Sequence, residues 1–296
     1  MLEVKLILCP IDFSEFSVRA YRYALSLAEH YQAKVVALHV VELWRYPSVG
    51  FAASAALYDE FCQACGESAK EKLQEFAKNH TDNEIQPEYV VHQGMAPDSI
   101  LAVAQARKVD VIVMGTHGQR GYDRLMLGSV TDRVMRRATC PVLVVSNPPP
   151  DNTAAGKQRR QAHRLRRILF CTDFSENSER ALSYAISAAE EYEAELTLLH
   201  VLEEAPSPAK REKAIAAATA QLDKLIPPKG RTTLNIKTAV RIGKPYQQII
   251  QLALEAQIDT VTMGVHGRGA IDLAVFGSTT YRVMQLGPCP VLAVHV

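Results

Sequence analysis

Two glycine-rich segments are the part of this chain best suited to chemistry. Each has the pattern Gly-x-x-Gly, nine further residues and then Gly-Ser, and an apolar run ending in Met-Gly precedes each one. Backbone amides, hydroxyl groups and the start of the following helix can converge there on one anion. We therefore expect a phosphate ligand, with glycines at positive φ and with Ser129 and Thr131 as hydroxyl donors. The motif residues are Gly115, Gly118, Gly128 and Ser129, and then Gly264, Gly267, Gly277 and Ser278.

The two loops belong to an internal repeat that covers most of the chain. The segments at Asp12 and Asp173 lie 161 residues apart, whereas the glycine loops lie 149 residues apart. The difference of 12 residues predicts an insertion in the first copy, between Glu42 and Gly94. Self-similarity of this kind predicts two domains of one design. We expect a first domain at 1–146, a linker with three consecutive prolines and a basic run at 147–165, and a second domain at 166–296.

Each copy alternates short β-rich runs with longer helical patterns, which is typical of parallel βαβ units in an α/β fold. Ser14 and Ser175 are placed to cap the first helix of their copies, and apolar residues follow at helical spacing. The expected buried stripes are Ala20, Tyr23, Ala24, Leu27, Ala28 and Tyr31, and Ala181, Tyr184, Ala185, Ala188, Ala189 and Tyr192. The expected strands, five per copy, are 5–9, 34–41, 88–92, 109–115 and 142–145, and 167–171, 195–202, 236–242, 260–264 and 291–296.

Three signals meet at one edge of each predicted sheet. Asp12 follows the first strand, Val40 ends the second and Gly115 ends the fourth, and ligands of open parallel sheets lie at such carboxyl ends. A carboxylate there suits ribose hydroxyls, and backbone groups at Val40 suit the edge of a flat base. The alternative is that Asp12 only caps the turn into the first helix and that the glycines are turn residues. The corresponding residues of the second copy are Asp173, Val201 and Gly264.

With these motifs in place, the chain resembles a tandem universal stress protein over both copies, without the linker and the insertion. The resemblance implies two five-stranded parallel α/β domains of strand order 3-2-1-4-5, adenine nucleotide alpha hydrolase-like, paired through their last strands as an intramolecular pseudo-dimer. It also implies ATP, with Mg²⁺ held mainly by the phosphates. The residues it assigns to the nucleotide are Pro10, Ile11, Asp12, Val40, Met114, Gly115, Thr116, His117, Gly118, Gln119, Gly128, Ser129, Val130 and Thr131, and Thr172, Asp173, Val201, Met263, Gly264, Val265, His266, Gly267, Arg268, Gly277, Ser278, Thr279 and Thr280.

The function implied by the resemblance is that of a nucleotide-dependent regulatory or stress-response module. Val265 stands where the family usually has a small hydroxyl residue, and Tyr281 where an acidic residue often follows, so we expect a weaker second pocket. Neither glycine loop contains a lysine, and the chain has no Gly-Lys-Ser/Thr P-loop, which favours binding over catalysis. A slow ATP hydrolase, or a carrier of a small hydrophobic ligand that uses the 44–66 insertion, are the alternatives.

Composition and the remaining motifs limit the partners. The net charge is +1 and no apolar stretch approaches the roughly 18 residues of a membrane span, so we expect a cytoplasmic protein with neither membrane nor nucleic-acid partner. Further self-association stays open. The six cysteines are expected to be reduced thiols. Cys62 and Cys65 have a metal or redox spacing but supply only half a zinc site, so a helical role is preferred. His39 and His200, within apolar strands, are expected to be hydrogen-bonded core residues.

Overall fold

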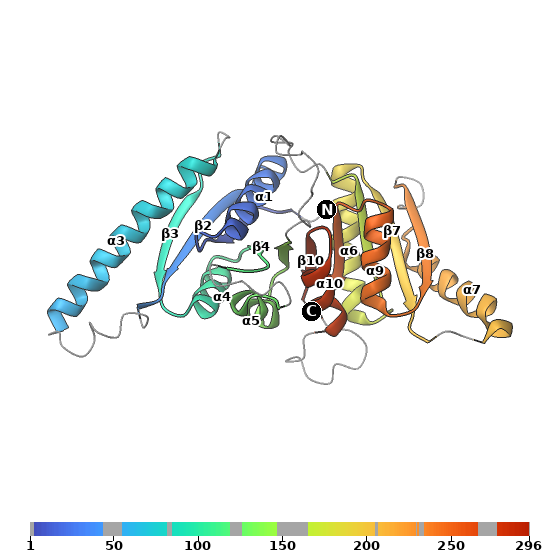
Figure 1. The fold of residues 1–296 in the computed structure, drawn as a ribbon. Coiled ribbons are helices and arrows are strands. Elements are labelled where there is room, and N and C mark those ends of the chain that lie inside the picture. Colours follow the sequence, from blue (N-terminus) through green and yellow to red (C-terminus); the bar gives the residue numbers. More distant parts are fainter. Residues whose placement is uncertain are drawn as a thin grey trace, which may run out of the picture. The chain divides into compact units, whose positions relative to one another are not determined.

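The computed structural model describes residues 3–43, 55–81, 85–118, 126–146, 165–204, 207–228, 230, 234–265 and 277–295. These residues form two compact units, which we call the N-terminal and the C-terminal unit (Figure 1). The first eleven residues of the expected insertion, 44–54, lie outside the described residues. So do four residues assigned to the nucleotide, namely Gln119, His266, Gly267 and Arg268.

The N-terminal unit is a parallel sheet with strand order β3-β2-β1-β4-β5. Helices α1 and α3 contact each other and cover one face, while α4 and α5 contact each other and cover the other face. The expected order 3-2-1-4-5 is confirmed. The strands are β1 (Leu6–Pro10), β2 (Lys34–Val41), β3 (Glu88–Gln93), β4 (Val111–Gly115) and β5 (Val142–Val145), and the helices are α1 (Glu15–Tyr31), α3 (Ala55–His80), α4 (Ala96–Ala106) and α5 (Ser129–Arg137).

The C-terminal unit repeats this design with strand order β8-β7-β6-β9-β10, again entirely parallel. Its strands are β6 (Arg167–Cys171), β7 (Glu195–Leu202), β8 (Ile236–Ile242), β9 (Thr260–Gly264) and β10 (Val291–Val294), and its helices are α6 (Glu176–Tyr192), α7 (Pro208–Leu225), α9 (Pro245–Glu255) and α10 (Ser278–Leu286). All ten strands lie within two residues of their expected bounds.

A carboxylate aligns the first strand with the fourth strand in each unit. Asp110 Oδ2 accepts hydrogen bonds from the backbone N–H groups of Lys5 and Leu6, both at 2.8 Å. Asp259 Oδ2 accepts the equivalent pair from Arg166 and Arg167, at 2.7 and 2.8 Å. These bonds satisfy amides at the start of β1 and β6 and fix the register with β4 and β9. The loops at the opposite, carboxyl ends of the strands therefore have a firm support.

The first helices are capped as expected and bury four of the six residues in each expected stripe, together with others. Ser14 Oγ accepts from Ser17 N at 3.2 Å, and α1 buries Tyr21 and Leu25 completely or nearly so. Tyr31, expected in the core, is only half-buried. A helix that covers a sheet buries a wide stripe, and the buried stripe of α1 extends beyond the expected one to Tyr21 and Leu25. The deviations from the expected stripes are that Leu27, Tyr31, Tyr184 and Ala188 are half-buried, while Tyr21, Leu25 and Leu182 are buried.

Helix α3 is the longest described element, with 26 residues against 18 in α7, its counterpart in the C-terminal unit. Its second half packs on the sheet through Leu73 and Phe76, whereas Leu57 in its first half is 57% exposed. The extra length follows from the insertion that the change of repeat offset predicts between Glu42 and Gly94. None of the described helices has the length and apolar character needed to cross a membrane.

Candidate functional site

The turn after β1 places Asp12 at the carboxyl edge of the N-terminal sheet. Asp12 Oδ1 accepts hydrogen bonds from Ser14 N at 3.0 Å and from Ser14 Oγ at 2.6 Å. Between these two residues Phe13 has a φ of 66°, a left-handed conformation that is rare for bulky side chains. Such a backbone outlier costs about 1–3 kcal/mol, so the surrounding structure must hold it in place. The Asp-Phe-Ser segment therefore fixes a carboxylate at the strand end, and the strain at Phe13 lowers the stability of the fold.

The C-terminal unit contains the same turn. Asp173 Oδ1 accepts from Ser175 N at 3.1 Å and from Ser175 Oγ at 2.6 Å, and Phe174 has a φ of 62°. Thr172, expected at the nucleotide, uses its hydroxyl inside the protein: its Oγ1 accepts from Phe174 N at 2.9 Å and hydrogen-bonds Ser178 Oγ at 2.8 Å. Thr172 thus supports the turn and has no exposed side chain to offer a ligand.

The second and third glycines of the N-terminal loop are needed because other atoms approach their backbone closely. A Cβ at Gly118 would overlap Asp12 Oδ2, so the loop and the carboxylate are in direct contact. A Cβ at Gly128 would lie 3.0 Å from Thr116 O and 3.2 Å from His117 Cα. Gly128 N also donates to Thr116 O at 2.8 Å, which closes the loop. The structure therefore brings Asp12, the first part of the loop and the start of α5 together.

The first glycine of each loop has a packing role instead. A Cβ at Gly115 would lie 2.8 Å from Phe16 Cβ and 3.0 Å from Phe16 O, and one at Gly264 would lie 3.0 Å from Asn177 O. These glycines let α1 and α6 approach β4 and β9. Positive φ among the described glycines occurs at Gly94 and Gly243, after β3 and β8. The expectation of positive φ is thus wrong for the described motif glycines, whose common property is the missing Cβ.

Helices α5 and α10 begin without a side-chain cap. The cap residues are glycines, and the first helical hydrogen bonds are Asp132 N to Gly128 O at 2.8 Å and Tyr281 N to Gly277 O at 3.0 Å. The backbone N–H groups of the first three residues of each helix therefore have no acceptor within the helix. At α1, in contrast, the Ser14 side chain occupies the equivalent place. An anion can therefore take the cap position of both helices, next to the amides of Ser129, Val130 and Thr131, and of Ser278, Thr279 and Thr280.

Thr131, expected as a hydroxyl donor, and Thr280, its counterpart in the C-terminal unit, both face inward. Thr131 Oγ1 donates to the buried Gly115 O at 2.8 Å, and Thr280 Oγ1 donates to Gly264 O at 3.0 Å. Thr131 is therefore wrong as a hydroxyl donor to phosphate, because its proton is used to fasten α5 to β4. The side chain of Thr116 is also buried, as is that of Val265 at the same place in the C-terminal unit. Val265 consequently removes no exposed hydroxyl from the second pocket.

His39 and His200 support the turn from the second strand of each unit. His39 Nδ1–H donates to Ile11 O at 2.7 Å, and His200 Nδ1–H donates to Thr172 O at 2.9 Å, since a carbonyl oxygen can only accept. The His39 ring lies 4.5 Å from the Phe13 ring. Burial lowers the pKa of His39, and the bond to Ile11 opposes this shift. Both histidines have the hydrogen bond that the sequence predicts, although each is only half-buried.

The residues assigned to the nucleotide divide into two groups by exposure. Ile11, Met114 and Met263 are buried, so only their backbone is available to a ligand. His117 hydrogen-bonds Thr116 Oγ1 through Nδ1 at 3.0 Å, and its buried Nε2 has no hydrogen-bond partner among the described residues. The half-buried or exposed members are Pro10, Asp12, Val40, His117, Gly118, Gly128, Ser129, Val130, Asp173, Val201, Gly277, Ser278 and Thr279.

An aromatic cluster behind the Asp12 turn was missed by the sequence analysis. Phe76 of α3 lies 5.7 Å from the Phe13 ring and 5.4 Å from the Tyr21 ring, both measured between centroids. Tyr21 in turn hydrogen-bonds Thr81 Oγ1 at 2.8 Å. The Asp-Phe-Ser repeat in both copies was a usable signal for the turn, but nothing in the sequence indicated which residue of α3 would pack on it.

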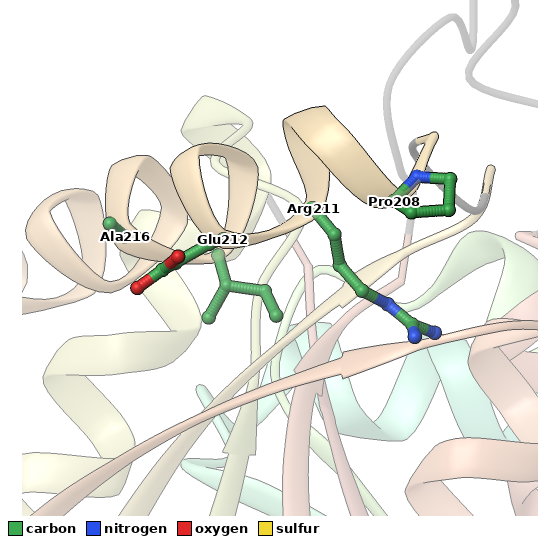
Figure 2. Close-up of a pocket in the computed structure, with 5 residues that line it drawn as sticks. Pro208, Arg211, Glu212 and Ala216 are labelled. Atoms are coloured by element: carbon green, nitrogen blue, oxygen red, sulfur yellow. The ribbon is translucent and has the colours of Figure 1, made fainter.

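A separate open hollow of about 380 Å³ lies along α7 (Figure 2). Its lining residues all belong to one face of this helix: Pro208, Arg211, Glu212, Ile215 and Ala216. Its polar groups come from α7 alone, whereas at the Asp12 turn polar groups from several elements meet. We therefore place the candidate site at the glycine loops and not in this hollow.

The fold and the site define an α/β protein in which one parallel unit, with an open helix N-terminus at its carboxyl edge, occurs twice. The sequence matches the universal stress protein family over residues 3–146 and 164–295, so the chain belongs to this family. A universal stress protein of Mycolicibacterium smegmatis is 25% identical over 308 residues, covering 98% of this chain and 96% of the relative.

Other relatives match one copy or show the shared fold. A universal stress protein of Methanocaldococcus jannaschii is 34% identical over 149 residues, covering 49% of this chain and 83% of the relative. The crystal structure of a universal stress protein from Archaeoglobus fulgidus has a TM-score of 0.72 at 24% identity, covering 99% of this chain and 97% of that one. The Mycolicibacterium and Archaeoglobus matches therefore each span both copies of this chain.

Proposed function

We propose that this universal stress protein binds ATP in each unit and acts as a nucleotide-dependent regulatory module. The observation that carries the proposal is the pair of uncapped helix starts, α5 and α10, at the edge where Asp12 and Asp173 are held. The orphaned Nε2 of His117 is a further polar atom that a ligand would satisfy. Phosphates would take the helix cap positions and the carboxylates would accept bonds from ribose hydroxyls, with Mg²⁺ held mainly by the phosphates.

Asymmetry between the units is part of the proposal, with the C-terminal site the weaker one. Asp132 in the first turn of α5 pairs with Arg136 at 3.0 Å, whereas α10 has Tyr281 and Gln285 at the same places. Arg136 belongs to the last turn of α5 and its charge is paired with Asp132, so it gives no direct support to a phosphate at the helix start. The asymmetry therefore rests on the replacement of Asp132 by Tyr281. The burial of Val265 removes one of the two sequence reasons for a weaker second site.

Two matched serine variants test the proposal site by site. Ser129 and Ser278 are exposed first residues of α5 and α10, so Ser129→Ala and Ser278→Ala remove one hydroxyl each without disturbing the core. A lost hydrogen bond to a charged phosphate is worth about 1.5–3 kcal/mol, or about 10- to 100-fold in affinity. Calorimetric titration of the full chain with Mg²⁺-ATP should show two classes of site, each weakened by one variant.

The same preparation separates binding from turnover. If the chain binds ATP and releases no phosphate during long incubation, it is a binding module, whereas steady release abolished by Asp12→Ala would identify a slow hydrolase. Absence of ATP binding by the wild-type chain, or identical titrations for wild type and both serine variants, would overturn the site assignment.

A further inference from the structure

Cys62 and Cys65 form a pair of accessible thiols that the proposed nucleotide sites do not use. Both lie on α3, three residues apart, and both are free and half-buried. Three of the other cysteines, Cys9, Cys171 and Cys289, are buried. Helix α3 runs beside β3, and its N-terminal end, near these thiols, extends past the sheet (Figure 1).

Contacts on both sides keep this turn of α3 helical. Gln93 Nε2, at the end of β3, donates to Cys62 O at 2.8 Å. The Tyr58 side chain lies one helical turn before Cys62 and contacts its thiol. The two thiols are therefore held on one turn of a regular helix.

Helical geometry determines which ligand fits the two sulfur atoms. Residues three apart on a helix have Cβ atoms about 5–6 Å apart. A disulfide needs a Cβ separation of about 3.5–4.5 Å, so it would require unwinding of this turn. A metal ion bridging two thiolates in a line needs sulfur atoms roughly 4.6 Å apart, twice a metal–sulfur bond of about 2.3 Å. An undistorted helix can meet this second requirement.

The surroundings favour a soft cation of low coordination number. Among the residues that the structure describes, no group of three or more His, Cys, Asp or Glu side chains could hold a metal ion, which leaves the pair without the further ligands of a tetrahedral zinc site. Thiolates favour copper(I), zinc and iron–sulfur clusters, and of these copper(I) is the one that two ligands can satisfy. Asp59, Glu60 and Glu67 on the same stretch of α3 add negative potential that favours a cation.

We propose that Cys62 and Cys65 bind one copper(I)-class ion as a linear dithiolate site. Both thiols release their protons as the two metal–sulfur bonds form, and no electron is transferred. This site is independent of nucleotide binding, so either proposal can fail without the other. It gives the chain a second ligand class that its glycine loops do not serve.

Competition with a chromophoric chelator tests the proposal. The full-length protein is titrated, without oxygen and with the thiols reduced, against the copper(I) complex of bicinchoninate. We expect the wild-type chain to withdraw one equivalent of copper and the Cys62→Ser and Cys65→Ser variants to withdraw none. X-ray absorption of the loaded protein should show two sulfur neighbours and no additional ligand.

Thiol position supplies the matched control. In the variant Cys65→Ser with Ala64→Cys, the second thiol moves about 200° around the helix from Cys62, and binding should be lost although the number of thiols is unchanged. In Cys65→Ser with Gly66→Cys, the thiol returns to the same face at four residues, and a Cβ there would lie 3.6 Å from Gln93 Nε2, an ordinary contact, so binding should be kept. Equal copper withdrawal by the Ala64→Cys variant and the wild type, no withdrawal by the wild type, or three or more sulfur neighbours would overturn the proposal.

Discussion

Substitution of Gly118 by alanine probes the contact between the glycine loop and the carboxylate. The added Cβ would lie inside the 3.0 Å limit that Cβ atoms do not cross, and the atom it meets is Asp12 Oδ2. The backbone at Gly118 does not have positive φ, so alanine adds no strain of its own. Gly118→Ala therefore acts on the site by rotating the Asp12 side chain out of place.

The expected cost is small for folding and large for binding. Rotation of Asp12 weakens its bonds to Ser14 N and Ser14 Oγ, at 3.0 and 2.6 Å, which compares with the loss of a helix cap at about 1 kcal/mol. A carboxylate that no longer meets the ribose loses about 1.5–3 kcal/mol of binding free energy. We expect the affinity of the N-terminal site for ATP to fall about 10- to 100-fold, while thermal unfolding changes by only a few degrees.

A double-mutant cycle, measured by calorimetry with Mg²⁺-ATP, isolates this contact. Asp12→Ala should lower the affinity by a similar factor, and Gly118→Ala added to it should lower the affinity little further, because the obstructed carboxylate is gone. Gly115→Ala is the contrasting control, since its Cβ meets Phe16 and should destabilise the fold. Additive losses from Gly118→Ala and Asp12→Ala, or an unchanged affinity in Gly118→Ala, would refute the reasoning.

Three further substitutions test how the site is supported. Thr131→Val leaves the buried Gly115 carbonyl without its hydroxyl donor. The free energy of unfolding, measured by denaturant titration, should fall by about 1–3 kcal/mol. An unchanged value would mean that this bond does not hold α5 against β4. Asp110→Ala removes two bonds at the start of β1 and should lower the melting temperature, with Asp110→Asn restoring part of the loss because it keeps one acceptor oxygen. His39 has a lowered pKa, so the unfolded chain takes up a proton near pH 6.5 that the folded chain does not. Stability should therefore fall as the pH drops below about 6.5, less so in His39→Gln, and a rise would contradict the burial of the neutral ring.

Much of the fold could be predicted because parallel strands have a strong local signal. Apolar runs without alternation at 34–41 and 260–264 give strands with those bounds, and the repeat confirms each assignment independently. The first strand was misplaced by one residue. The fourth begins at Val111 and not at Val109, since Asp110 turns its side chain to the amides of Lys5 and Leu6. Such a bond between residues over 100 positions apart leaves no local trace in the sequence.

The site was predicted in its parts but not in the role of each part. Spacing indicated that Gly118 and Asp12 belong to one edge, and the structure brings them into contact. Spacing could not show that a side chain at position 115 would collide with Phe16, or that the Thr131 hydroxyl turns inward. Both features depend on how closely a helix approaches the sheet. Pairing of the two copies through their last strands stays a prediction.

The two interpretations of Asp12, a turn cap or a ligand residue, are combined in the structure. Oδ1 caps the turn through Ser14, which is all that a structural role requires. A cap alone explains neither a phenylalanine at a φ of 66° nor a glycine placed against Oδ2, and both units have the strained phenylalanine. Because that strain lowers stability and is nevertheless present twice, at the same edge as the uncapped helix starts, it supports a turn shaped for a ligand and not only for the fold.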